Sequence, residues 1–142
     1  AVSPSPASSE ALETAARLAL EAGLVVQEIG FDTDSDENLR SGVRALIGSD
    51  MVDLDFEDVV DVALLWFRED DGDLTDALVD AITPLADQGV VWLLTPKPGR
   101  DGHVEPEDIT EAAQTAGLRQ TSTISAGASW QGTRLVAPRA KR

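Results

Sequence analysis

Two apolar stretches constrain what this chain can fold into more than any other feature of its sequence. Residues 59–67 are apolar except for Asp61, and residues 90–95 are apolar up to their last residue, Thr95. A strand that is apolar on both sides is buried on both faces, which is typical of a parallel sheet covered by helices. We therefore expect the core to be built on these two strands.

Helical periodicity lies between and around the two strands. Residues 74–85 carry apolar side chains at i, i+3, i+4, i+7, i+8 and i+11, which predicts an amphipathic helix that ends before Gly89. Residues 118–138 have the length of an antiparallel hairpin with its turn near residues 126–129. The other expected elements are helices over residues 10–22, 36–47 and 106–116 and a strand over residues 24–29. This order predicts an α/β fold with three layers, a mostly parallel Rossmann-like sheet and a C-terminal antiparallel hairpin.

The ends of the chain differ in composition from its middle. Residues 1–9 are small, rich in proline and serine and without a period, so a flexible N-terminal tail is expected. A length of 142 residues suits one domain with a sizeable core. We expect a single α/β domain over residues 10–138 and a basic tail over residues 139–142.

The composition excludes several kinds of site. The chain has no cysteine, which rules out disulfides, thiolate metal ligands and cysteine nucleophiles. Its single histidine, His103, rules out a multi-histidine metal centre. No apolar run approaches the roughly 20 residues of a membrane span, and no signal segment opens the chain. A cytoplasmic protein without membrane contact is therefore expected.

Charge is distributed very unevenly along the chain, whose formal net charge is −15. Residues 28–80 hold 17 acidic and 3 basic residues, whereas residues 113–142 hold 5 basic residues and no acid. Nucleic-acid affinity comes largely from neutralising phosphates with Lys and Arg, so the acidic middle disfavours nucleic acid as a partner of the domain body. A basic protein surface is the expected partner, and the oligomeric state is left open.

An acidic run after the first expected strand begins like a calcium-binding loop. Asp32, Asp34 and Asp36 alternate as such a loop requires. The sixth and twelfth positions, which need glycine and a bidentate glutamate, hold Glu37 and Val43. We therefore interpret the run as a charged loop that caps the next helix and expect no bound metal.

The same region resembles the cofactor loop of class I methyltransferases. In that family a strand is followed by Glu/Asp-x-Gly-x-Gly-x-Gly, whose glycines let the backbone approach S-adenosylmethionine. Glu28 and Gly30 match the pattern, but Asp32 and Asp34 stand where the next two glycines belong. Their side chains would crowd the cofactor and repel its carboxylate. The loop is a degenerate version of the family's motif, and no cofactor is predicted.

Residues 10–138 are also similar, as a whole, to an uncharacterised actinobacterial family of unknown function. The resemblance rests on residues 26–30 (Val-Gln-Glu-Ile-Gly), 60–66 (Val-Asp-Val-Ala-Leu-Leu-Trp), 92–97 (Trp-Leu-Leu-Thr-Pro-Lys), 102–106 (Gly-His-Val-Glu-Pro) and 132–136 (Gly-Thr-Arg-Leu-Val). The resemblance implies a degenerate methyltransferase-like, Rossmann-like fold and implies no particular activity.

A loop after the second apolar strand concentrates polar side chains that bind or transfer protons. It contains Lys97, Arg100, His103 and Glu105 and precedes an expected helix. Lys97 and Arg100 beside a helix N-terminus suit an anion, and His103 suits acid–base chemistry near neutral pH. The alternative is a glycine-softened surface loop in which His103 bonds locally.

Ligands of open α/β sheets bind beyond the carboxyl ends of the strands, where this loop and the Gly30 loop both emerge. The candidate ligand-binding residues are Glu28, Gly30, Asp32, Lys97, Arg100, His103 and Glu105. One segment is acidic and the other basic, so they are expected either to hold a zwitterionic ligand across a cleft or to pair with each other.

The three tryptophans are expected to differ in burial. Trp66 and Trp92 lie in the apolar strands and are expected in the core. Trp130 follows the expected hairpin turn and is expected to be partly exposed.

Three functional hypotheses remain open, one of which is a purely structural acidic partner of a basic protein. The favoured one is a non-catalytic acidic binding or regulatory domain on a degenerate methyltransferase-like scaffold. The alternative is an enzyme that binds S-adenosylmethionine or a nucleotide-like ligand at the carboxyl edge of the sheet.

Overall fold

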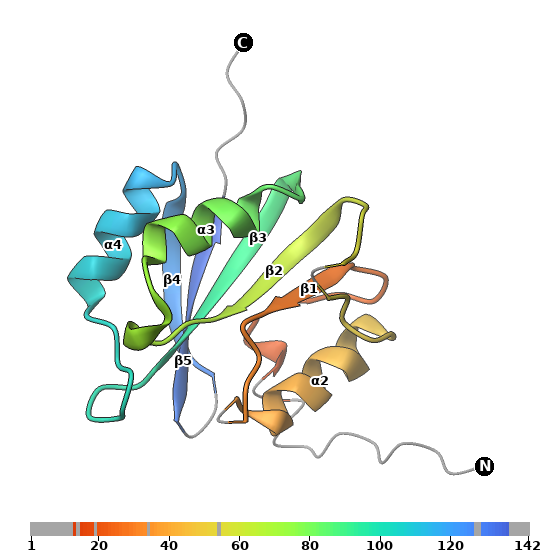
Figure 1. The fold of residues 1–142 in the computed structure, drawn as a ribbon. Helices are drawn as coiled ribbons and strands as arrows, with labels where there is room; N and C mark the ends of the chain where they lie inside the picture. The colour runs from red at the N-terminus through yellow and green to blue at the C-terminus, as the bar shows by residue number, and fades with distance from the viewer. Residues whose placement is uncertain are drawn as a thin grey trace.

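Five strands form one mixed sheet with the order β1-β2-β3-β5-β4 (Figure 1). The computed structural model describes residues 13, 15–18, 20–33, 35–53, 55–126 and 129–136. Within these ranges only the backbone is described at residues 87 and 88. The strands are β1 Val26–Ile29, β2 Val60–Trp66, β3 Leu85–Pro96, β4 Arg119–Ser125 and β5 Trp130–Val136. The helices are α2 Glu37–Ile47, α3 Leu74–Ile82 and α4 Pro106–Thr115, with a 3₁₀ turn, η1, at Glu69–Asp71. The expected tails lie outside the described residues, as do residues 10–12, 14 and 19 of the helix expected over residues 10–22. Of the described residues in that range only 13, 15 and 16 are helical, so the expectation that the helix extends to residue 22 is wrong.

The fold is of the mixed α/β class, but the expectation of a mostly parallel sheet is wrong. β1–β2 and β2–β3 pair in parallel, whereas β3–β5 and β4–β5 pair antiparallel. After α4 the chain enters the outer edge strand β4, and the expected hairpin then returns β5 into the gap beside β3. A strand that returns through a short connection must run antiparallel to the strand before it.

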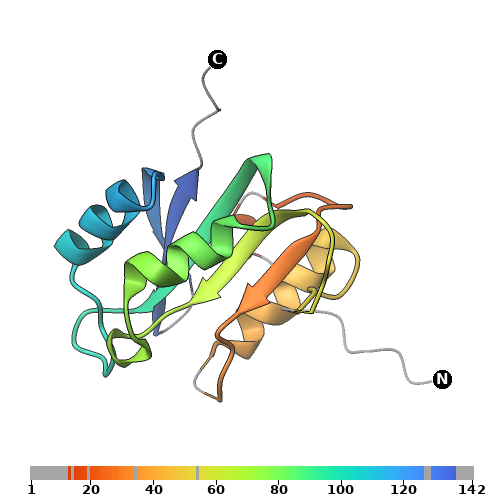
Figure 2. The same ribbon diagram turned by 45° about the horizontal axis from the view of Figure 1, so that its top comes forward.

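Helices lie on both faces of the sheet (Figure 2). On one face, α3 and α4 pack against alternating residues of β2 and β3, such as Leu65 and Leu93. On the other, α2 and the segment near Leu18 pack against Leu64 and Trp92. Successive side chains of β2 and β3 point to opposite faces of the sheet, and both faces are covered by apolar clusters. Both strands therefore appear in the sequence as continuous apolar runs.

Local signals explain where the helices begin and end. Asp36 accepts a hydrogen bond from the backbone N–H of Leu39 at 3.0 Å, and Asp73 caps α3 in the same way. α3 ends at Ile82, three residues earlier than expected, because Pro84 cannot continue a helix. None of the helices in the described part of the chain is long and apolar enough to cross a membrane.

The burial of Trp66 and Trp92 is confirmed, but the expectation of a partly exposed Trp130 is wrong. Trp130 is only 3% exposed. Its ring meets that of Trp66 edge-on, with centroids 4.9 Å apart. At the start of β5 the Trp130 side chain is therefore directed inward, onto the face that α2 covers.

Candidate functional site

Three loops emerge together at the carboxyl edge of the parallel strands. Residues 30–36 follow β1, residues 67–73 follow β2 and residues 97–105 follow β3 (Figure 1). Because β2 lies between β1 and β3, its loop separates the two segments that were expected to face each other. Among the described residues no hydrogen bond or ion pair joins those two segments directly.

Glu28, the acidic residue of the methyltransferase-like pattern, is engaged inside the protein. Its Oε2 and Oε1 accept hydrogen bonds from Nε and Nη2 of Arg40 at 2.6 and 2.8 Å. The indole N–H of Trp66 donates a third bond to Oε2 at 2.9 Å. The Glu28 side chain is only 10% exposed, so this carboxylate is both neutralised and largely covered.

Arg40 extends the network to the start of α2. Its Nη1 bonds Glu37, and its guanidinium lies 3.9 Å from the centre of the Phe31 ring. The bond to Glu28 raises the pKa of Arg40 despite the burial of the guanidinium. Burial tends to raise the pKa of Glu37, but the hydrogen bonds from Arg40 and Arg44 outweigh it and leave that pKa lowered.

Gly30 is required by the local backbone. Its φ is +80°, a conformation that side chains disfavour. A Cβ at this position would also collide with the carbonyl oxygen of Trp66. The glycine that matches the cofactor pattern thus has a packing role, independent of any ligand.

Asp32 stabilises the loop that contains it through local hydrogen bonds. Its Oδ1 accepts a hydrogen bond from the N–H of Thr33, and its N–H donates to Oγ of Ser35 at 3.0 Å. Asp34 lies outside the described residues.

Arg68, which sequence reasoning missed, lies at the centre of the edge. Its Nη1 donates to the carbonyl of Gly30 at 3.0 Å and to Asp71 at 3.1 Å. Its guanidinium also lies 5.2 Å from the centre of the Trp130 ring. It is the single basic residue of residues 45–96, a signal that marks it for an internal role in so acidic a stretch.

The loop of residues 97–105 is shaped by its own backbone. Lys97 is tied to Ser129 of the hairpin by a backbone hydrogen bond of 2.9 Å. Nδ1 of His103 donates to the carbonyl of Pro96 at 2.8 Å, which leaves Nε2 3.9 Å from a carboxylate oxygen of Glu105. His103 therefore makes a local hydrogen bond, and its role in acid–base chemistry stays a prediction.

A cavity of about 370 Å³ lies between this loop and the hairpin. Arg100 lines it with Asp101, Ser129 and Trp130, whereas Lys97 and His103 are not part of its lining. The residues of the Gly30 loop do not reach it either. The seven candidate residues share one edge of the sheet but do not line one cleft.

A second hollow, which we call the α3–α4 groove, was not anticipated from the sequence. It measures about 410 Å³ and is lined by Phe67, Leu74, Val104 and Ala112 at apolar positions and by Glu69, Asp73, Asp108 and Glu111 at acidic ones, with Gly72, Thr75 and Thr115. The sequence signal was the acidic residues that precede α3, Glu69 and Asp73, together with those on α4, Asp108 and Glu111.

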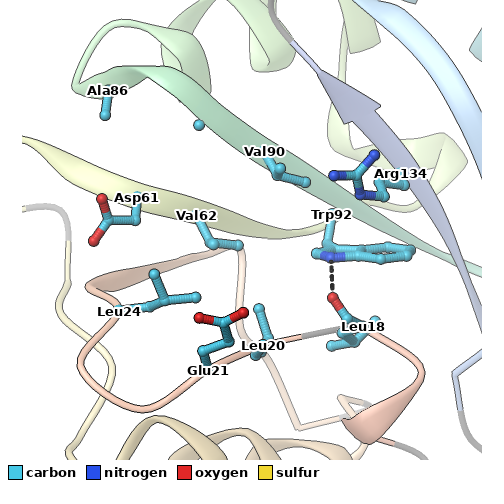
Figure 3. A pocket seen from close by; sticks show the side chains of 11 residues that line it. Leu18, Leu20, Glu21, Leu24, Asp61, Val62, Ala86, Val90, Trp92 and Arg134 are labelled. Carbon is cyan, nitrogen blue, oxygen red and sulfur yellow. Dashed lines mark hydrogen bonds between the residues drawn. The ribbon is translucent and has the colours of Figure 1, made fainter.

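A third cavity, of about 290 Å³, lies at the opposite end of the sheet, near the amino ends of β2 and β3 (Figure 3). Apolar side chains form most of its wall, and Asp61, Glu21 and Arg134 also line it. Across the described residues no group of three His, Asp or Glu side chains is arranged to hold a metal ion.

Comparisons with known proteins agree on the family and the fold. The model of the family described as "Protein of unknown function (DUF3052)" matches residues 15–139. The chain is 44% identical over 135 residues to the uncharacterized proteins Rv2239c of Mycobacterium tuberculosis and Mb2263c of Mycobacterium bovis, which covers 95% of this chain and 85% of each relative. The expected membership of an uncharacterised actinobacterial family is thereby confirmed.

The solved structures that it resembles have methyltransferase-like folds. The pyocyanin biosynthetic protein PhzM aligns with a TM-score of 0.62 at 13% identity, over 90% of this chain but 54% of its own, so this chain spans about half its length. A SAM-dependent methyltransferase from Aquifex aeolicus aligns with a TM-score of 0.52 at 13% identity, over 93% of this chain and 95% of its own. The magnesium protoporphyrin IX methyltransferase of Synechocystis, with bound SAM, gives a TM-score of 0.52 at 12% identity, over 91% and 77%.

At these sequence identities the similarity to solved structures supports the fold alone. The match of the family model over residues 15–139 supports membership of the family. The chain belongs to the DUF3052 family of proteins of unknown function and has a methyltransferase-like fold.

Proposed function

We propose that this protein is a non-catalytic binding domain that uses a methyltransferase-like scaffold to hold a basic segment of a partner protein in the α3–α4 groove. The observation that carries the proposal is the lining of that groove, in which four carboxylates surround an apolar floor. Among the described residues no basic side chain lines the groove.

Three of the four carboxylates are available to a partner. Asp73 is used as the cap of α3, where it accepts hydrogen bonds from Thr75 and Asp76. The side chains of Glu69, Asp108 and Glu111 are exposed and have no hydrogen-bond or ion-pair partner among the described residues. Like charges that share one hollow repel each other, and a cationic ligand relieves that repulsion.

The floor of the groove favours a peptide over a bare cation. Phe67, Leu74 and Val104 are buried core residues whose edges reach the groove. A segment with Lys or Arg on either side of an apolar side chain matches both the rim and the floor. Such charge complementarity mainly increases the rate and specificity of association.

The state of the Gly30 loop supports a non-catalytic interpretation. A ligand that needed the Glu28 carboxylate would have to displace Arg40 from both of its oxygens and Trp66 from one. The backbone of Trp66 lies directly against Gly30, and Arg68 donates a hydrogen bond to the Gly30 carbonyl. Protein atoms therefore fill the space beside this glycine.

The proposal is tested with a fluorescent peptide of alternating Lys and Leu residues, whose binding is followed by anisotropy. The double variant Asp108→Asn/Glu111→Gln removes two groove carboxylates, and Asp50→Asn/Glu57→Gln removes two exposed carboxylates elsewhere as a matched control. We expect the groove variant to bind at least tenfold more weakly, about 1.4 kcal/mol, and the control to change far less. Equal losses in both would mean that only net charge matters.

Calorimetry with S-adenosylmethionine tests the alternative. Saturable binding of that compound, lost when the carboxyl-edge residue Arg68 is replaced by alanine, would favour the enzyme hypothesis and contradict the non-catalytic one. We expect no heat of binding.

A further inference from the structure

Asp61 interrupts the most apolar strand of the sequence, and the proposed function does not use its carboxylate. It is half-buried on β2. Its Oδ2 accepts a hydrogen bond from the backbone N–H of Val25 at 2.9 Å. The same side chain lines the cavity of about 290 Å³ at the amino ends of the strands, which we call the β2–β3 cavity.

The outer wall of this cavity is anchored to the sheet and to α2. The indole N–H of Trp92 donates to the carbonyl of Leu18 at 3.1 Å. The N–H of Gly23 donates to the carbonyl of Ile47 at 3.0 Å, and Val25 is held by Asp61. Three hydrogen bonds thus hold the described residues of this segment beside the cavity.

Opposite charges line the β2–β3 cavity without pairing. Arg134 projects from β5 on the sheet side, and Glu21 projects from the outer wall (Figure 3). Arg134 bonds the hydroxyl of Thr121 through Nη1, and among the described residues it has no carboxylate partner. Glu21 has no side-chain hydrogen-bond or ion-pair partner in the described part of the chain.

The rest of the wall is largely apolar. Val62, Val90 and the indole of Trp92 lie on the sheet side, and leucines lie on the outer wall (Figure 3). A cavity of this size is close to the lower limit of small-molecule pockets, about 300 Å³, so it suits a ligand of a few carbon atoms.

We propose that the β2–β3 cavity is a binding site for a small zwitterion with an apolar body, of the class of the apolar α-amino acids. The guanidinium of Arg134 receives the ligand carboxylate, and Glu21 receives the ammonium group. Asp61, with one oxygen not used by Val25, adds negative potential on the ammonium side. The apolar side chain of the ligand is covered by Val62, Val90 and Trp92. The site is independent of the α3–α4 groove, which lies on the other face of the sheet.

Three features of the ligand are tested separately on the full chain by calorimetry. The probes are L-leucine, 4-methylpentanoic acid without the ammonium group, 3-methylbutylamine without the carboxylate, and glycine without the apolar body. We expect L-leucine to bind and each of the other three to bind at least tenfold more weakly. Absence of L-leucine binding, or equal binding of the acid or the amine, would overturn the proposal.

Variants of the lining locate the site. Arg134→Gln and Glu21→Gln should each weaken L-leucine binding at least tenfold, whereas Arg119→Gln and Glu57→Gln, exposed residues outside the cavity, should leave it unchanged. Val90→Phe fills the cavity and should abolish binding while the protein stays folded, as judged by its thermal melt. Unchanged binding in Arg134→Gln or Val90→Phe would place the ligand elsewhere and refute the site.

Discussion

Arg40 and Gly30 show how single residues decide the character of the carboxyl edge. Arg40 joins Glu28 to Glu37 and covers the Phe31 ring. Gly30 allows the chain to turn directly against the Trp66 carbonyl. Arg40 neutralises buried charge and Gly30 permits a close backbone contact, so substitutions here should act on stability.

Replacing Arg40 with methionine should destabilise the protein markedly. The Glu28 carboxylate, 10% exposed, would be left without its cation, and breaking a buried pair costs about 3 kcal/mol or more. Arg44→Met, which removes only a 3.3 Å contact to exposed Glu37, should cost less than about 1 kcal/mol. Urea denaturation of both variants measures the difference.

The double variant Glu28→Gln/Arg40→Met distinguishes charge from packing. It should recover part of the stability lost in Arg40→Met, because an uncharged amide is less costly to bury than an unpaired carboxylate. A double variant as unstable as the single one would assign the loss to packing of the Arg40 side chain.

Replacing Gly30 with alanine should also destabilise the fold. The positive φ costs about 1–2 kcal/mol for an L side chain, and the collision with the Trp66 carbonyl adds to it. Gly23 has a similar φ of +91°, but a Cβ added there would meet nothing within 4 Å, so Gly23→Ala isolates the conformational cost. Thermal melts should rank wild type, Gly23→Ala and Gly30→Ala in falling order, and equal losses would contradict the contact.

Among the elements, β2 and β3 carry the two cores. Residues of β2 alternate between the cluster under α3 and α4 and the cluster under α2, so each strand is packed on both faces. The edge elements contribute differently. β4 is exposed along most of its length, and β1 is covered on its outer side by one parallel bridge between Gln27 and Val52.

A carboxylate in the middle of β2 should prevent folding. Leu65→Asp places an unpaired charge in a fully packed position, which costs several kcal/mol against a total stability of about 5–15 kcal/mol. Val59→Asp, at a position 57% exposed just before the same strand, is the matched control and should stay soluble. Circular dichroism and gel filtration separate the two results, and a wild-type-like melt of Leu65→Asp would contradict the packing.

At the scale of the molecule, the charge asymmetry of the sequence becomes an asymmetry in space. The acidic residues 28–80 form β1, α2, β2 and α3, and the acid-free residues 113–142 include the β4–β5 hairpin at the opposite edge of the sheet. The protein is therefore electrically polarised across its sheet. Self-repulsion is concentrated among the acidic residues 28–80 and in the α3–α4 groove, to which α4 adds Asp108 and Glu111.

Stability should rise with salt for this reason. Raising NaCl from about 0.01 M to about 0.15 M shortens the Debye length to about 8 Å and screens the repulsion among the acidic residues. The melting temperature should increase over this range, with most of the gain at low salt. A flat or falling melting temperature would show that the charges are well dispersed or internally paired.

The sequence by itself determined the elements, because their signals are local. Apolar runs and helical spacing predicted β2, β3 and α3, the acidic run that ends at Asp36 predicted the start of α2, and the length of residues 118–138 predicted the hairpin. Each of these signals depends on residues within a few positions of one another, and backbone geometry repeats over that distance.

Only the tertiary structure decided how residues far apart in sequence meet. Trp66 and Glu28 are 38 positions apart, and Trp92 and the Leu18 carbonyl are 74 apart. No local pattern showed that Arg68 would separate the two halves of the expected cleft, that Trp130 would turn inward, or that β5 would enter beside β3. These outcomes depend on strand order and side-chain packing, whose free energies arise from contacts that exist only once the sheet has formed.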